Sequence, residues 1–127
     1  MIFGIGTDMV RIDRIAAAHE RFGRHFVERL LMPEELAAFD ESKRPVRFLA
    51  MHFAAKEAIV KALGTGFRHG LWIRDTGFLP NAWGRPEVLF SERGRAVADR
   101  LGAGEGHVSL SDESGLVVAF AMLMKKP

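Results

Sequence analysis

The chain has 127 residues and carries 18 basic and 16 acidic side chains, so its formal net charge is only +2. Apolar residues make up 48% of the sequence, which excludes extended disorder, and the lack of cysteine excludes disulfides and cysteine-based zinc sites. The longest apolar run, Leu116–Met124, is too short to cross a bilayer, and the N-terminus lacks the pattern of a secretion signal. We therefore expect one cytoplasmic domain over residues 1–127.

The N-terminal residues Ile2–Thr7 are expected to form a strand with one unusually bare face. Side chains alternate along a strand, so Phe3, Ile5 and Thr7 share one face. The opposite face carries Gly4, Gly6 and Asp8. Glycine within a strand is typical of a place where another backbone or a ligand approaches closely. We therefore expect a close neighbour on the face that ends in Asp8.

Helical segments are predicted between this strand and the middle of the chain. They are Asp13–Phe22, capped by Asp13 and ended by Gly23; Arg24–Leu31; a helix whose first turn contains Pro33; and Pro45–Leu63, ended by Gly64. Pro45–Leu63 has the strongest pattern. Its apolar back consists of Phe48, His52, Ala55, Ile59 and Leu63. Its opposite face carries Ala50, Ala54, Glu57 and Lys61, which either leaves room for a ligand or packs on the glycines of the first strand.

Arginines gather in the first of these helical segments. At about 100° per residue, Arg14 and Arg21 share a helix face, and Arg11 and Arg24 lie within about 80° of that pair. The arginines form either a docking surface for an acidic or phosphorylated partner or an ordinary solvated face.

The second half of the chain is expected to be mostly strands. The predicted elements are strands at Leu71–Ile73, Thr76–Leu79 and Pro86–Phe90, a helix at Glu92–Leu101, and a hairpin of His107–Ser111 with Leu116–Met124. Together the elements predict an α+β fold, an antiparallel sheet packed against one long helix and shorter helices. Because the last strand is apolar on both faces, we also expect an oligomer that covers it.

The residues best placed for chemistry are two separated acids. Asp8 ends the first strand on its glycine face, and Glu57 lies on the small-residue face of the long helix. Two carboxylates brought together repel each other unless a cation lies between them, and Mg²⁺ with few protein ligands keeps open positions for phosphates. Lys61, one turn beyond Glu57, would then neutralise a leaving phosphate. The alternative is a strand-end turn and an ordinary Glu57–Lys61 helix pair.

Other candidate groups have equally plain alternatives. Gly64, Thr65 and Gly66 either offer backbone N–H groups to an anion or simply end the helix. His107 and Ser109 share one face of a strand, and they either contact a phosphate or simply form an exposed polar face. His52 is expected to be a satisfied core histidine, and Lys56 to pack its stem while its ammonium stays in water.

Three motifs follow one another along the chain. They are Gly4-Ile5-Gly6-Thr7-Asp8, then Phe53-Ala54-Ala55-Lys56-Glu57-Ala58 with Lys61-Ala62-Leu63-Gly64-Thr65-Gly66, then His107-Val108-Ser109-Leu110-Ser111. Together they resemble the motifs of the holo-acyl-carrier-protein synthases, small 4′-phosphopantetheinyl transferases, over nearly the whole chain. The resemblance implies transfer of 4′-phosphopantetheine from coenzyme A to a serine of apo acyl carrier protein, with release of adenosine 3′,5′-bisphosphate, in fatty acid biosynthesis.

The resemblance also implies roles for particular residues. Asp8 and Glu57 would hold Mg²⁺, and Glu57 and Lys61 would be the catalytic residues. Coenzyme A would be bound by Lys61, Gly64, Thr65, Gly66, His107 and Ser109. Arg14, Arg21 and Arg24 would dock the carrier protein. The family pattern implies a homotrimer with active sites at the subunit interfaces.

Two positions depart from the family pattern. Arg11 stands where the family usually has glutamate, and His52 stands where it usually has a basic residue before the Phe53 motif. These departures favour, as the alternative, a non-catalytic paralogue that binds carrier protein and keeps the fold. A nucleic-acid-binding domain is disfavoured because no recognised motif accompanies the basic and aromatic residues. No membrane partner is expected.

Overall fold

The computed structural model describes the whole chain, Met1–Pro127. Its elements are β1 (Ile2–Arg11), α1 (Ile12–Phe22), α2 (Arg24–Leu30), α3 (Pro33–Asp40), α4 (Pro45–Leu63), the 3₁₀ turn η1 (Ile73–Asp75), β2 (Thr76–Pro80), β3 (Pro86–Phe90), α5 (Glu92–Leu101), β4 (Ala103–Glu113) and β5 (Leu116–Lys125). None of the helices is both long and apolar enough to span a membrane.

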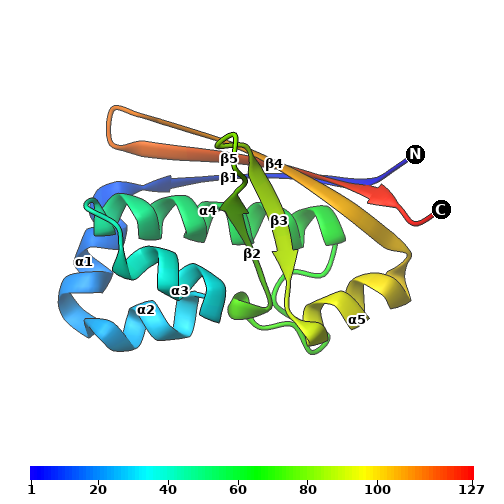
Figure 1. Cartoon of the computed structure of the whole chain (residues 1–127), viewed down its shortest axis with the longest axis horizontal. Helices are drawn as coiled ribbons and strands as arrows, with labels where there is room; N and C mark the ends of the chain where they lie inside the picture. Colours follow the sequence, from blue (N-terminus) through cyan, green and yellow to red (C-terminus); the bar gives the residue numbers. More distant parts are fainter.

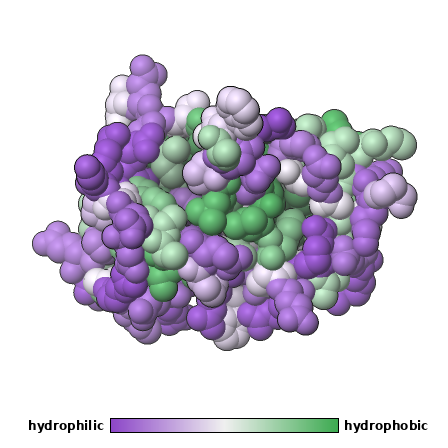
Figure 2. All heavy atoms as spheres, viewed as in Figure 1, coloured by the Kyte–Doolittle hydropathy of each residue, from purple (hydrophilic) through white to green (hydrophobic).

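The strands form one antiparallel sheet around the long helix α4, in the order β1-β5-β4-β3-β2. β1, β5 and β4 lie along α4, while β2 and β3 run across it (Figure 1). The short helices α1, α2 and α3 gather at one end of the molecule, and α5 lies at the other (Figure 1). The expected α+β fold is therefore confirmed. Figure 2 shows apolar side chains in the middle of this view, near β2 and β3, with polar side chains around them.

α4 begins and ends where the sequence predicts. Pro45 occupies its first turn, where a missing N–H costs nothing, and Gly64 ends it with a φ of 82° that suits glycine. Ala50 and Ala54 are completely buried. The small-residue face of α4 is therefore filled by the protein itself at these positions and is not an open site.

The bare face of β1 meets α4 at very short range, as the glycine pattern predicted. A Cβ placed on Gly4 would lie 2.0 Å from the carbonyl oxygen of Ala62, and one placed on Gly6 would lie 2.2 Å from that of Ala58. Real Cβ atoms do not approach backbone oxygens so closely. Only glycine at these positions lets the helix settle on the strand.

Replacing Gly4 by alanine is expected to destabilise the fold strongly, by about 3 kcal/mol or more, because the added methyl group meets rigid backbone. Urea unfolding followed by circular dichroism measures the change. Gly104→Ala serves as the control, since the nearest heavy atom to its Cβ would be 3.3 Å away. Equal stability of the two variants would contradict the close contact between β1 and α4.

The two sides of the long strands differ in character. We call the side of β1, β5 and β4 that faces α4 the inner face, and the opposite side the outer face. The inner face of β5 carries Val117, Ala119, Ala121 and Leu123, which are completely buried. The outer face exposes large apolar side chains: Ile5 (59%), Met9 (64%), Val118 (43%) and Phe120 (40%). A cluster of exposed apolar side chains of this kind is typical of an interaction surface.

Local expectations failed at three places. β1 continues past Thr7 to Arg11 because β5 pairs with it along this whole length. Leu71–Ile73 is not a strand, since the N–H of Trp72 donates to the Asp75 carboxylate and starts η1 instead. Asp13 is not the cap of α1; its carboxylate accepts a hydrogen bond from Arg11 at 2.9 Å.

Candidate active site

Asp8 and Lys61 meet between β1 and α4. Asp8 points from the inner face of β1, and its Oδ1 lies 3.2 Å from the Nζ of Lys61. The same ammonium donates to the carbonyl of Thr7 at 2.9 Å. The glycines before Asp8 bring the strand close enough for this contact. The Asp8 side chain remains partly open to solvent, so a ligand can reach it.

Glu57 belongs to the same charged cluster. It is half-buried, and burial raises the pKa of its carboxyl group, helped by the negative charge of Asp8. The positive charges of Lys61 and Arg14 oppose the rise in pKa. The two predicted acids, one from the strand and one from the helix, therefore lie close enough for the charge of Asp8 to act on Glu57. Arg14, which α1 supplies, was not expected this near to the pair.

The donor set fits a divalent cation with open positions. Two carboxylates that repel each other are stabilised when a cation lies between them, and carboxylate oxygens are the ligands that Mg²⁺ prefers. No group of three or more His, Asp or Glu residues gathers anywhere in the chain. Asp8 and Glu57 would thus be the protein ligands, and the remaining positions would be left for phosphate oxygens and water.

The turn after α4 uses its own backbone donors. The N–H groups of Gly64, Thr65 and Gly66 all point to the carbonyl of Val60, at 3.0, 3.2 and 3.4 Å. The hydroxyl of Thr65 donates to the carbonyl of Gly66. The plain alternative, a glycine end to the helix, therefore describes the free protein, and an anion would have to displace these bonds to use the same N–H groups.

His107 and Ser109 lie on the other side of the sheet from Asp8. His107 pairs with Met122, which pairs with Ile5, and Ser109 pairs with Phe120. These residues belong to the outer face. Asp8 pairs with Ala119 on the inner face. A single chain therefore does not bring His107 and Ser109 into the cluster of Asp8, Glu57 and Lys61.

The arginines of the predicted docking surface are in different situations. The guanidinium of Arg24 makes a forked ion pair with Asp40, at 2.6 and 3.1 Å, and so its charge is largely matched. Arg21 lies over the ring of Phe22 and is exposed. Arg14 is exposed near Glu57. Arg21 and Arg14 are therefore the members whose charge is open to a partner from outside.

Comparison with known proteins decides the family. The sequence profile described as the 4′-phosphopantetheinyl transferase superfamily matches residues 4–121. The chain belongs to this superfamily. A holo-[acyl-carrier-protein] synthase from Neisseria meningitidis serogroup A is 42% identical over 125 residues, which cover 98% of this chain and 100% of the relative.

Solved structures agree. The crystal structure of a holo-[acyl-carrier-protein] synthase from Neisseria meningitidis matches with a TM-score of 0.93 and 41% identity, over 98% of this chain and 100% of that one. The Helicobacter pylori holo-[acyl-carrier-protein] synthase in complex with coenzyme A matches with a TM-score of 0.81 and 28% identity, over 94% of this chain and 98% of that one. The similarity extends over nearly the full length in both cases.

The two departures from the family pattern occupy different surroundings in this phosphopantetheinyl transferase. Arg11 is exposed at the end of β1, where it pairs with Asp13. His52 is buried, stacked between the rings of Phe48 and Phe78 with centroids 4.0 and 4.1 Å away. Its Nδ1 lies 2.5 Å from Glu35 Oε2, and the expectation of a satisfied core histidine is confirmed.

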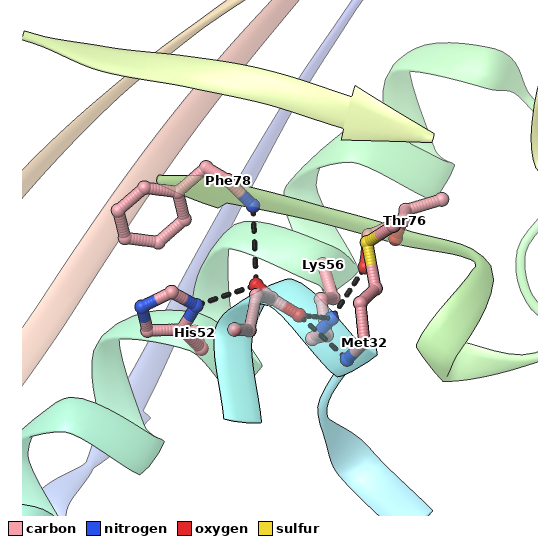
Figure 3. Close-up of polar contacts among 6 residues, drawn as sticks. Met32, His52, Lys56, Thr76 and Phe78 are labelled. Carbon is pink, nitrogen blue, oxygen red and sulfur yellow. Dashed lines mark hydrogen bonds and ion pairs between the residues drawn. The ribbon is translucent and has the colours of Figure 1, made fainter. Parts of the chain in front are cut away.

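The expectation that the Lys56 ammonium lies in water is wrong. The ammonium is completely buried, where it donates to the carboxylate of Glu35 and to the carbonyl of Thr76 (Figure 3). No local pattern in the sequence indicates this pair, because Glu35 lies 21 positions away.

Two hollows in the surface of this transferase were not predicted from the sequence. A hollow of about 350 Å³ at the start of α4 is lined by Lys43, Arg44, Arg47, Phe48 and neighbouring residues. A second, mostly apolar hollow of about 580 Å³ lies between α2, α4 and η1, and Arg29 and Arg74 are among the residues that line it. A cluster of Lys, Arg and Pro at 43–47 was the only available hint of the first.

Proposed function

We propose that this chain is a magnesium-dependent holo-acyl-carrier-protein synthase. It transfers 4′-phosphopantetheine from coenzyme A to a serine of apo acyl carrier protein and releases adenosine 3′,5′-bisphosphate. The observation that carries the proposal is the convergence of Asp8, Glu57 and Lys61 in a chain of this family. We place the activity in the cytoplasm.

The reaction needs little covalent help from the protein. The serine hydroxyl attacks the phosphorus that bears pantetheine, the bond from that phosphorus to the bridging oxygen breaks, and adenosine 3′,5′-bisphosphate leaves while the hydroxyl loses its proton. Catalysis of such a transfer rests on positioning and on neutralising charge. When bound, Mg²⁺ would neutralise charge on the pyrophosphate oxygens.

Each residue of the cluster has a definite task. Asp8 from β1 and Glu57 from α4 would hold the cation. Lys61, whose ammonium already lies beside Asp8, offsets the charge that grows on the leaving phosphate. Thr7 keeps this ammonium in place through its carbonyl. No cysteine or other nucleophile is required, which agrees with the composition of the chain.

We propose that a homotrimer completes the site. His107 and Ser109 are candidate ligands of coenzyme A, yet they lie on the outer face, away from Asp8. The same face exposes Ile5, Met9 and Phe120, which a neighbouring copy would cover. If the outer face of one copy abuts the Asp8 cluster of the next, both sets of residues border one cleft. Arg85, whose guanidinium lies 3.4 Å from His107, then adds a positive charge there.

We propose that Arg14 and Arg21, whose charges are open to solvent, dock an acidic carrier protein, and that Arg24, already paired with Asp40, contributes less to this surface. Replacing Arg21 by glutamate is expected to raise the KM for carrier protein by about tenfold or more, with little change in the KM for coenzyme A. Steady-state kinetics with each substrate varied, at low and at high salt, measures the effect, which high salt should reduce. Lys125→Glu, at the exposed end of β5, is the control. Equal effects of the two variants would contradict a docking surface on α1.

The proposed function has a direct test. Purified protein incubated with apo acyl carrier protein, coenzyme A and Mg²⁺ should increase the mass of the carrier by one phosphopantetheine, as intact-protein mass spectrometry detects. The same mixture with chelator should show none. Failure with several acidic carrier proteins would refute the transferase.

The alternative is a non-catalytic paralogue that binds carrier protein and keeps the fold. The departures at Arg11 and His52 motivate it. Arg11 pairs with Asp13 in solvent and His52 is absorbed in the core, so neither blocks the cluster of Asp8 and Glu57. The alternative predicts carrier binding without any gain in mass.

A further inference from the structure

A buried polar network fastens α4 next to Glu57. The Glu35 carboxylate accepts hydrogen bonds from the N–H of Met32 at 3.0 Å and from the N–H of Phe78 at 3.1 Å. It also contacts His52 and Lys56, each at 2.5 Å. Figure 3 shows the four contacts converging on this single side chain from Met32 just before α3, from α4 and from β2.

The charges of this network balance. Burial alone would raise the pKa of Glu35, but the contacts with His52 and Lys56 outweigh it and hold the pKa below its usual value. Burial lowers the pKa of His52, which favours the neutral imidazole. One carboxylate therefore faces one ammonium, with the histidine as a neutral partner.

The network leaves no space for adjustment. A Cβ on Gly77 would lie 2.4 Å from a carboxylate oxygen of Glu35, so β2 passes directly over this side chain. Lys56 also donates to the carbonyl of Thr76, the residue before Gly77. Two positions of α4 one turn apart, 52 and 56, are thus tied to groups outside the helix.

Stability alone is a weak reason for such a pair. A buried ion pair is often no more stabilising than well-packed apolar residues of similar size, whereas its directed bonds fix a geometry. The contact of α4 with β1 is made by glycines and alanines, which form a smooth surface. The directed hydrogen bonds of His52 and Lys56 therefore fix the rotation of α4 about its axis and its position along that axis.

We propose that the Glu35–Lys56 pair is a positioning device that sets the Glu57 carboxylate against Asp8 and thereby tunes the affinity of the cation site. Glu57 follows Lys56 directly, about 100° further round the helix. When the tie on Lys56 is lost, α4 can turn or slide, and the two carboxylates no longer meet at the separation that a cation requires. The proposal rests on the cation site of the proposed function.

The test compares Lys56→Met with Val27→Ala, a buried core variant in α2 that removes none of the hydrogen bonds of the network. Binding of Mn²⁺, as a probe for Mg²⁺, is measured by electron paramagnetic resonance in the presence of adenosine 3′,5′-bisphosphate, next to the melting temperature of each variant. Lys56→Met is expected to weaken Mn²⁺ binding about tenfold or more, as is common for groups behind metal ligands. Val27→Ala is expected to melt earlier but to bind Mn²⁺ like the wild type.

A second variant covers the case in which Lys56→Met does not fold. Glu35→Gln combined with Lys56→Met removes both charges at nearly constant volume, and it is expected to fold and still bind Mn²⁺ weakly. Wild-type affinity in either folded variant would overturn the proposal, as would a wild-type protein that binds no Mn²⁺. A wild type that binds Mn²⁺ but transfers nothing would refute the proposed activity alone, since the change in affinity is measured without turnover.

In the active enzyme the same effect has a kinetic signature. Lys56→Met is expected to raise the Mg²⁺ concentration for half-maximal rate about tenfold or more, with kcat largely restored at saturating Mg²⁺. A merely structural pair would instead lower the amount of folded enzyme and leave the Mg²⁺ dependence unchanged, which would overturn the proposal.

Discussion

Glu57→Gln will abolish phosphopantetheine transfer, with an expected fall in kcat of about 10³-fold or more. The amide keeps the size and the helix but removes one of the two negative charges that hold the cation. Intact-protein mass spectrometry of the carrier protein over time measures the rate. Full activity in this variant would exclude Glu57 from the cation site.

The folded state of this variant provides its own control. Burial and the charge of Asp8 raise the pKa of Glu57, which means that the ionised carboxylate is disfavoured in the metal-free fold. Above that raised pKa the wild type carries this cost and Glu57→Gln does not. At neutral pH without metal the variant is therefore expected to melt no earlier than the wild type, so lost activity cannot be blamed on unfolding.

Phe120→Asp will separate the subunits and with them remove the activity. Phe120 lies on the outer face of β5, 40% exposed in the single chain, and a charge there cannot be buried against a neighbour. Light scattering should show a monomer, and the transfer rate should fall by about 100-fold or more because each site loses the residues of its neighbour. Leu101→Asp, equally exposed at 40% on α5 and away from the outer face, should keep the assembly.

Mixing inactive variants tests the shared site more sharply. Glu57→Gln lacks the cation side, and His107→Ala lacks the outer-face side. When the two are mixed, unfolded and refolded together, random three-membered rings should regain about one quarter of the wild-type rate, because half the sites have an intact Glu57 and half of those face an intact His107. No recovery would contradict a site formed between copies.

The sequence predicted what local patterns can encode. The alternation of Gly4, Gly6 and Asp8 predicted a close neighbour on one face of the strand, and Pro45 and Gly64 marked both ends of α4. Each of these features is determined by the backbone conformation of only a few consecutive residues. The charges of Asp8 and Glu57 act on each other because each residue lies on the side of its element that faces the other element; their joint hold on a cation stays a prediction.

What failed depends on distant parts of the chain. Lys56 was expected in water because its helix neighbours say nothing of Glu35, whose carboxylate compensates the buried ammonium. Residues Leu71–Ile73 look like a strand by composition, yet the side chain of Asp75 captures the N–H of Trp72 and bends the segment. The opposite placement of His107 and Asp8 follows from the register of β4, β5 and β1, which no residue type reveals.

The contact of Gly4 and Gly6 with α4 has a consequence for how the enzyme can evolve. Aspartate and glutamate have short side chains, so the proposed cation site depends on a strand without side chains that lets α4 lie directly on its backbone. A methyl group added there would pull the two acids apart without touching either of them. The distance between the two acids thus depends on Gly4 and Gly6, which carry only hydrogen where other residues have a side chain and which take no part in the chemistry.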